Sequence, residues 1–425
     1  MLTSLQYSEK LRNVHSEKNI RIVFFFFCIW AFVLLSRPQD IFHELKIFRP
    51  ALIFAFLTLG FAAIKFNNLR YPSLFRERQI TYITALLFVM IIGIPTALHR
   101  RITFEEIFTG YFINVLFVFV FYKIIHSTKT LSTVILIGCL GSGFYSAYGL
   151  VEYDPRLGRL AYGTMFDPND LVYFAIGFLP LNLLFMHRDN SLWVRLACLC
   201  SFSASILLIL NTGSRGGFLS LVVVTLLLLL SKNESIGAPL KIMVIGIIFA
   251  VLTLASVNTE RFQSIFNIKE DYNVTAETGR IQLWKIGIET MLENPLSGVG
   301  VGNYVRAVGL DRQARNAETL RWQSPHSSVI QIGAETGILG LIIFLLSSLN
   351  VVRILNKVGK QTTQERLSKI CQMGVIGFTG LFISGLFLSQ AYSIYWLFYI
   401  AVSAVINQLM VSETIQAAPA QMRGV

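Results

Sequence analysis

Thr278-Gly279-Arg280-Ile281-Gln282-Leu283-Trp284 stands in the one long polar stretch of a chain made mostly of apolar runs. The same stretch continues with Asn294-Pro295-Leu296-Ser297-Gly298-Val299-Gly300-Val301-Gly302-Asn303-Tyr304 and Ser324-Pro325-His326-Ser327-Ser328. Glu335-Thr336-Gly337-Ile338-Leu339-Gly340 follows inside the next apolar run. A polar segment of this length between apolar runs predicts a loop that carries most of the chemistry, held by helices on both sides.

The composition outside this stretch is that of a membrane protein. Of 425 residues, 54% are hydrophobic and only 14% are charged, whereas a soluble domain carries about 25% charged residues. Apolar runs of ~20 residues are long enough to cross a bilayer as helices. The sequence therefore predicts an all-α, polytopic membrane protein with about twelve transmembrane helices and one long periplasmic loop. The expected spans are residues 22–36, 50–66, 80–98, 108–126, 131–150, 168–187, 193–211, 216–231, 239–257, 328–350, 371–388 and 391–410.

The basic residues predict the orientation of these spans. They gather in alternate short loops, and the most basic loop, residues 351–370, contains five Lys and Arg side chains against one Glu. By the positive-inside rule these loops and both termini are cytoplasmic. The net charge of +12 is explained by this bias, so nucleic acid is not an expected partner. No A-x-A-like cleavage site follows the first apolar run, which predicts a retained span rather than a signal peptide.

The spans divide the chain into three parts. Residues 1–257 are expected to form helices 1–9, residues 258–327 the periplasmic loop, and residues 328–425 helices 10–12 with a cytoplasmic tail. The loop far exceeds the ~12–15 residues of an idle connection. Within it, Ile281, Trp284, Ile288, Met291 and Leu292 recur at helical spacing, which predicts an amphipathic helix on the membrane surface or on the bundle. Asn294-Pro295 should end that helix.

Two arginines stand at expected helix starts on the outer side. Arg215 follows Asn211-Thr212-Gly213-Ser214 at the start of a span, and Arg280 begins the amphipathic helix. A cation there faces the positive end of the helix dipole, which is unfavourable unless an anion binds. Two guanidinium groups that meet on one anion would suit a diphosphate. The alternative is a contact with lipid headgroups or with acidic loop residues.

His326 follows Pro325 and opens the next span at the outer interface. The helix N-terminus disfavours imidazolium, so a neutral His326 is expected to accept the proton of an attacking hydroxyl. The alternative is an interfacial histidine that caps its helix. Glu335 falls on the opposite face of a straight helix and is therefore expected to have a structural hydrogen-bonding role.

The remaining polar positions of the loop are predicted substrate contacts. The segment Gly298 to Gly302 has no preceding strand, so the glycines are expected to form a tight turn near the substrate and not a nucleotide loop. The predicted substrate-binding set, besides Arg215 and Arg280, is Arg312, Arg315, Arg321, Gly300, Asn303 and Tyr304. Asp167 and Asp170 are two carboxylates without an evident third ligand, so a turn at a helix start is favoured over a divalent metal. No metal or cofactor is predicted.

These pieces together resemble the superfamily of O-antigen ligases and O-antigen polymerases, which are glycosyltransferases of the bacterial envelope. The resemblance is carried by Ser214-Arg215-Gly216, Thr278-Gly279-Arg280 with Leu283-Trp284, Asn294-Pro295-Leu296-Ser297-Gly298-Val299-Gly300, Pro325-His326-Ser327-Ser328 and Glu335-Thr336-Gly337-Ile338-Leu339-Gly340. It covers about residues 160–350. Asp167-Pro168-Asn169 looks like the family's Pro-Asn turn, and Ser327 stands where members often have Asn.

The resemblance implies a GT-C-type fold in the bacterial inner membrane with the active site facing the periplasm. It implies a glycan donor on undecaprenyl diphosphate and transfer without a nucleotide sugar or a metal. Arg215 and Arg280 would then bind the diphosphate, and His326 would activate the acceptor hydroxyl, with inversion at the anomeric carbon. The membrane lipids around the spans would deliver the donor.

The acceptor distinguishes several functions that share this donor chemistry. Lipid A–core would make the protein a ligase, which is slightly favoured by the single compact loop. A second lipid-linked repeat unit would make it a polymerase for O-antigen or exopolysaccharide, and a protein hydroxyl is a third possibility. A transporter or flippase is the rival of a different class, but transporters place their polar groups near the bilayer midplane, often in inverted repeats.

Overall fold

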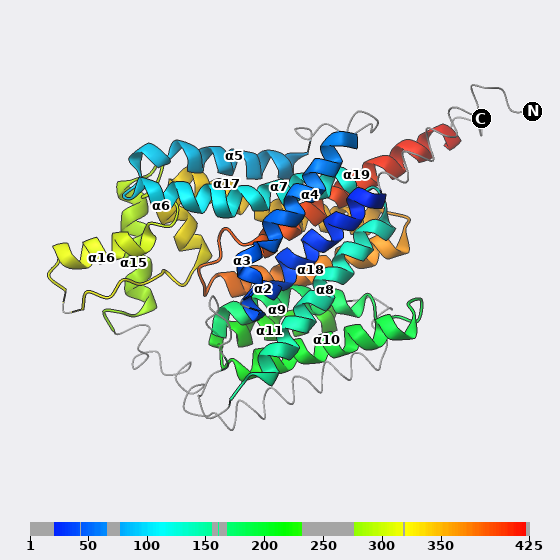
Figure 1. The fold of residues 1–425 in the computed structure, drawn as a ribbon, viewed down its shortest axis with the longest axis horizontal. Coiled ribbons are helices and arrows are strands. Elements are labelled where there is room, and N and C mark those ends of the chain that lie inside the picture. Colours follow the sequence, from blue (N-terminus) through cyan, green and yellow to red (C-terminus); the bar gives the residue numbers. More distant parts are fainter. Residues whose placement is uncertain are drawn as a thin grey trace, which may run out of the picture.

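The computed structural model describes residues 21–42, 44–65, 77–154, 160, 168–231, 276–317 and 319–421. These residues form helices, and no strand occurs among them, which confirms the predicted all-helical fold. The long helices run side by side as a bundle (Figure 1). The elements are the helix Arg21–Ser36, α2 (Pro38–Ile41), α3 (Leu45–Phe48), α4 (Pro50–Lys65), α5 (Arg78–Ile92), η3 (Ile94–Thr96), α6 (Arg100–Glu105), η4 (Glu106–Tyr111), α7 (Phe112–Ile124), α8 (Thr128–Val151), α9 (Pro168–Leu183), α10 (Leu192–Asn211), α11 (Arg215–Leu230), α15 (Arg280–Glu293), α16 (Tyr304–Ala314), α17 (Ser328–Gln361), α18 (Glu365–Gly385) and α19 (Ile394–Gln421).

The length and composition of these helices are those of a multi-pass membrane protein. Within the described part of the chain, seven helices are long and apolar enough to cross a membrane, and three shorter apolar helices accompany them. Described helices occupy every predicted span except residues 239–257, which lie outside the described residues together with residues 258–275 of the predicted loop. The count of twelve spans, the GT-C type and the periplasmic position of the loop stay predictions.

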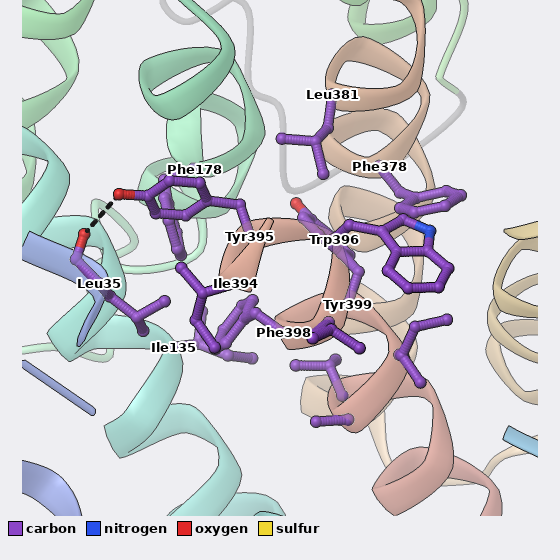
Figure 2. Packing of buried hydrophobic residues seen from close by; sticks show 14 of the residues in the cluster. Leu35, Ile135, Phe178, Phe378, Leu381, Ile394, Tyr395, Trp396, Phe398 and Tyr399 are labelled. Carbon is purple, nitrogen blue, oxygen red and sulfur yellow. Dashed lines mark hydrogen bonds between the residues drawn. The ribbon is translucent and has the colours of Figure 1, made fainter. Parts of the chain in front are cut away.

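The centre of the bundle is the first half of α19. Tyr395, Trp396 and Phe398 are almost completely buried, and they pack against Phe178 of α9 and Phe378 of α18 (Figure 2). Their polar atoms bond to neighbouring helices: the Tyr395 hydroxyl donates to the Leu35 carbonyl at 3.4 Å, as the dashed line in Figure 2 shows, and the Trp396 Nε1 donates to the Ser348 hydroxyl at 3.0 Å. Lipid chains are as apolar as this core, so close packing and such hydrogen bonds stabilise the bundle more than the hydrophobic effect does.

A glycine-rich segment enters a break in α17. Gly337 has φ 72° and ψ −174°, which interrupts the helix. The amide of Val299 donates to the Ala334 carbonyl at 2.9 Å, and the amide of Gly300 donates to the Glu335 carbonyl at 3.0 Å. Beyond the break, the amide of Ile338 donates to the Pro295 carbonyl at 2.8 Å. The backbone groups that the break removes from the helix are therefore paired with the loop.

Gly298→Ala should lower the stability of the protein. Gly298 has φ +61°, and a Cβ there would lie 2.4 Å from the Glu335 carbonyl carbon. Strain and overpacking together are expected to cost about 1–3 kcal/mol. Thermal unfolding of the full chain in detergent measures this as a lower Tm. Gly60→Ala in α4 is the matched control, because nothing lies within 4 Å of its Cβ position. Equal Tm values for the two variants would contradict the expectation.

The helix α15 confirms the bounds predicted for the amphipathic helix and shows which of its residues pack on the bundle. It begins at Arg280 and ends at Glu293, with Asn294 as C-cap. The residues that it buries are Leu283, Ile286, Gly287 and Thr290, whereas Ile281, Ile288 and Leu292 of the predicted apolar stripe are exposed. The helix thus has two apolar sides, and the one that packs is the side that meets α16 and α17. Both α15 and α16 lie at the end of the bundle opposite to the C-terminal part of α19 (Figure 1).

Candidate functional site

The start of α11 is fixed by its N-cap. The Ser214 hydroxyl accepts a hydrogen bond from the Gly217 amide at 3.0 Å and donates to the Asn169 side chain at 2.6 Å. Asn169 belongs to the Pro-Asn-Asp turn that begins α9. Ser214 occupies a favourable N-cap position because its hydroxyl satisfies one of the free amides of the first turn. Arg215 is consequently the first residue of α11 and is half-buried, as the sequence predicts for its place in the helix.

A second contact seats the start of α11 against the connection between α18 and α19. We call this connection, residues 386–393, the α18–α19 link. A Cβ on Gly216 would lie 2.8 Å from the Cβ of Phe387 in the link. Only glycine permits this approach without displacing the link. The glycines after Arg215 therefore let the helix start and the link touch.

His326 is bound to the same link. It lies two residues before α17, with φ 48° in the left-handed region. Its backbone amide donates to the Ser389 hydroxyl at 3.1 Å. Ser328 adds two bonds, because its hydroxyl donates to the Leu388 carbonyl at 2.8 Å and accepts from the Gln390 amide at 3.0 Å. These bonds fix the backbone around His326 relative to the link.

The helix α15, which begins at Arg280, contacts the residue before His326. The Trp284 Nε1 donates to the Pro325 carbonyl at 2.9 Å, and Arg280 lies four residues, about one helical turn, before Trp284. Gly279 at the N-cap supplies no side-chain hydrogen bond to the first turn of α15. An uncapped helix start with a half-buried arginine is a favourable environment for an anion. We conclude that α11, α15 and the residues before α17 are joined through the link and through Pro325.

No sequence motif predicted that the α18–α19 link belongs to this arrangement. Ser389 and Gln390 interrupt two apolar runs, and a polar break at the same end as Arg215 and His326 was the available signal. The Gln390 side chain also donates to Asp170 at 3.1 Å, so the link connects α9 with α17. Asp170 thus takes part in this hydrogen bond, while Asp167 lies outside the described residues. No group of three or more His, Cys, Asp or Glu side chains suited to a metal occurs in the described ranges.

The other predicted arginines have different neighbours. Arg312 is 2% exposed, and its guanidinium donates to the Gln323 side chain at 2.9 Å and to the Glu277 carbonyl at 3.3 Å. It also donates to the Arg321 carbonyl. Arg315 is exposed and forms ion pairs with Glu289 and Asp311. Arg312 therefore ties residues 321–323 to the start of α15, and the predicted substrate contacts of Arg312, Arg315 and Arg321 stay predictions.

Gly300, Asn303 and Tyr304 are buried in the loop. The Asn303 side chain donates to the Thr103 hydroxyl at 2.7 Å, and the Tyr304 hydroxyl donates to the Leu283 carbonyl at 2.5 Å. A Cβ on Gly300, where φ is +91°, would lie 2.4 Å from the Cβ of Ala97. These contacts join the loop to α15, to α6 and to Ala97 in the segment before α6. Contact of the three residues with a substrate stays a prediction.

Glu335 has the structural role that its position predicts. It is buried in α17, and its carboxylate accepts from the Tyr304 amide at 3.2 Å and from the Tyr392 hydroxyl at 2.8 Å. A buried carboxylate requires such partners. Glu335 thereby holds the start of α16 and the α18–α19 link on either side of α17.

Glu335→Ala should destabilise the protein. The two donors, the Tyr304 amide and the Tyr392 hydroxyl, would lose their acceptor at a cost of about 1–3 kcal/mol each. Glu335→Gln keeps one acceptor oxygen and should unfold at an intermediate temperature. Thermal unfolding of the purified variants measures the order of their unfolding temperatures. Glu293→Ala, on the exposed side of α15, is the control. If Glu335→Ala and Glu293→Ala unfold at the same temperature, the bridging role is refuted.

Comparison with known proteins gives one family. A family model described as O-antigen ligase matches residues 200–345. The match includes Arg215, Arg280, His326 and Glu335, and it ends before the α18–α19 link. No curated protein matches the chain.

Proposed function

We propose, from the match of residues 200–345 to the O-antigen ligase family model, that the chain is a member of the superfamily of O-antigen ligases and polymerases and transfers a glycan from undecaprenyl diphosphate to an acceptor hydroxyl. The family implies a ligase or polymerase enzyme of the glycosyltransferase kind, with lipid-linked glycans as substrates in a membrane. We place the reaction on the periplasmic side of the bacterial inner membrane. The acceptor that we propose is lipid A–core, which makes the protein an O-antigen ligase.

The proposed role of Arg215 and Arg280 is to bind the diphosphate of the donor. Each is the first residue of a helix, at the end where backbone amides point out of the helix. Amides and guanidinium groups both donate to phosphate oxygens. Anchoring the donor at two helix starts of different elements would hold the diphosphate in one orientation while its polyprenyl chain remains in the lipid.

The proposed role of His326 is that of a general base. The acceptor hydroxyl gives its proton to the imidazole, and its oxygen forms a bond to the anomeric carbon of the glycan. The bond from that carbon to the phosphate oxygen breaks, and undecaprenyl diphosphate leaves with the electron pair. Attack from the opposite side of the leaving group inverts the anomeric centre. The arginines stabilise the charge that develops on the diphosphate.

One observation supports this function more than any other. The α18–α19 link contacts Gly216 beside Arg215 and accepts the hydrogen bond of the His326 amide, while Trp284, one turn after Arg280, donates to Pro325. Residues more than a hundred positions apart are thereby brought to one neighbourhood at helix starts. Transporters instead distribute polar groups near the bilayer midplane on broken helices.

The test is a reconstitution that identifies the product. The purified full chain in nanodiscs receives an undecaprenyl-diphosphate glycan with lipid A–core, with a second lipid-linked repeat unit, or with a hydroxyl-bearing peptide. Mass spectrometry of each mixture is expected to find the glycan joined to lipid A–core. A product formed only with the repeat unit would identify a polymerase. Transport of donor across liposomes without a new covalent product would refute the proposal.

A further inference from the structure

A cavity of about 820 Å³ lies beside the α18–α19 link and is lined in part by its residues Ser389, Gln390 and Tyr392. Its described lining comes from the ends of helices that are distant in sequence: residues 34–52, residues 106–114, Gln331 of α17 and residues 389–395. Pockets of ~300–1,000 Å³ are typical of sites for small molecules. The volume is therefore sufficient for a ligand of several rings.

The cavity shares a wall with the backbone of His326. Ser389, whose hydroxyl accepts from the His326 amide at 3.1 Å, is one of the lining residues. Gln331, one turn after Ser327 at the N-cap of α17, also lines the cavity and accepts from the Ala391 amide at 3.2 Å. A ligand in the cavity is thus separated from His326 by the first residues of the link.

The charges in the lining are close to balanced. Arg37 forms an ion pair of 2.5 Å with Asp40, a residue that is itself almost completely buried. Arg49 and Glu106 contribute one charge of each sign. Asp40, which lies outside the lining, pairs with Arg37, so Arg49 and Glu106 leave no net excess of positive charge. A diphosphate requires such an excess of cationic donors. The cavity therefore suits a ligand without a large net charge.

The uncharged lining is rich in groups that bond to hydroxyls. It holds the amides of Gln39, Asn114, Gln331 and Gln390 together with hydroxyls of serine, threonine and tyrosine. Amides donate and accept, as sugar hydroxyls do. The half-buried ring of Tyr392, whose centroid lies 6.1 Å from that of the buried Tyr111, adds apolar surface that can cover the carbon face of a sugar ring. The combination is that of a carbohydrate site.

The backbone around the cavity is strained where it presents charged side chains. Arg37 and Arg49 have φ values of 49° and 45°, in a region that residues other than glycine rarely adopt. Glu106 begins the π-helical turn η4, and a Cβ on Gly302 would lie 2.8 Å from its Cγ. Strained residues and π-helical turns cluster at functional sites. A void left by imperfect packing would require neither the left-handed arginines nor the π-helical turn.

We propose that this cavity binds the carbohydrate of the acceptor, with Glu106, Gln331 and Gln390 as hydrogen-bonding partners of its hydroxyls. The inference rests on the proposed function, in which the acceptor supplies the attacking hydroxyl. It divides the two substrates between the two sides of the α18–α19 link: the donor diphosphate lies by Arg215 and Arg280, and the acceptor sugar lies by Ser389 and Gln390. The reacting hydroxyl extends past Ser389 toward His326.

The first test measures binding without any transfer. The full chain in nanodiscs is titrated with the delipidated core oligosaccharide, and saturation-transfer NMR and calorimetry report binding. Ala51→Trp fills the cavity at its lining, whereas Phe56→Trp, on the same helix but 72% exposed, is the matched control. We expect Ala51→Trp to weaken binding about tenfold or more and Phe56→Trp to bind as the native chain does. Inorganic pyrophosphate should not displace the oligosaccharide.

Three outcomes of the binding test would overturn the proposal. The first is equal binding by the Ala51→Trp variant and the native chain, and the second is no binding by the native chain. The third is displacement by pyrophosphate, which would make the cavity an anion site. If Ala51→Trp unfolds, Gln331→Leu and Glu106→Gln replace it, because each removes a hydrogen-bonding group of the lining without adding a large side chain.

The second test separates this inference from the proposed function. With donor and lipid A–core present, cavity variants should raise the KM for the acceptor about tenfold and leave the KM for the donor unchanged. Oligosaccharide binding that depends on the cavity, without transfer to any acceptor, would refute the function and keep the cavity site. Transfer with an unchanged acceptor KM in the Ala51→Trp variant would refute the cavity site and keep the function.

Discussion

Replacing Arg215 or Arg280 with alanine should abolish glycan transfer while the protein still inserts and folds. Each guanidinium is proposed to stabilise the leaving diphosphate, and loss of one such donor costs about 10²–10³ in rate. Arg215→Lys and Arg280→Lys should recover only part of the activity, because an ammonium does not grip two phosphate oxygens as the guanidinium fork does. A gel assay of glycan-modified lipid A–core measures the rate of transfer, and thermal unfolding of each variant shows whether it is folded.

Arg101→Ala is the matched control for these two variants. Arg101 likewise lies in the first turn of its helix, as the second residue of α6, and is paired with Glu105 at 2.7 Å, but its side chain is 83% exposed. Exposed ion pairs of this kind contribute little, so the Arg101→Ala variant should transfer glycan at the native rate. Near-normal transfer by Arg215→Ala or by Arg280→Ala would remove that arginine from the proposed site.

His326→Ala should lower the rate of transfer by about 10²–10⁴ without weakening donor binding. A general base contributes within this range, and its removal leaves the arginines in place. The left-handed backbone of His326 is held by the link, so alanine at this position keeps the amide bond to Ser389. Binding of labelled undecaprenyl-diphosphate glycan, measured beside the rate of transfer, separates the two effects.

His187→Ala is the control for the histidine variant. His187 lies between α9 and α10 and pairs with Asp189 at 2.9 Å, away from the contacts of the α18–α19 link. The His187→Ala variant should transfer glycan at the native rate. A His326→Ala variant that retains most of its transfer activity would refute the general-base role. Loss of donor binding in the same variant would instead place His326 among the donor contacts.

The local pattern of apolar runs and capping residues was sufficient to predict the helices and several of their ends. The apolar runs predict the spans because any segment in lipid must satisfy its own backbone hydrogen bonds, and a helix does so within the segment. Ser214 before Arg215 and Asn294-Pro295 after α15 mark ends that the structure confirms. Glu335 could be assigned a structural role because helical spacing places it on the opposite face from His326.

Pattern could not decide which apolar side of α15 is buried. Leu283 and Ile286 pack on α17, while Ile281 and Ile288 remain exposed. Hydrophobicity separates the interior of a soluble protein from its surface, but here both lipid and core accept apolar side chains. The sequence did not predict the break in α17 at Gly337 either. The carbonyls that the break frees accept hydrogen bonds from the amides of Val299 and Gly300, in a distant part of the chain.

The sequence alone determined an all-helical membrane fold, the order of its motifs and the residue types on which glycan transfer would depend, since these follow from local composition and spacing. Only the tertiary structure decided which of those residues become neighbours. The bonds from His326 to Ser389 and from Gln390 to Asp170 join positions 63 and 220 residues apart. Such contacts depend on how complete helices pack, and the cavity beside the link exists only after they have packed.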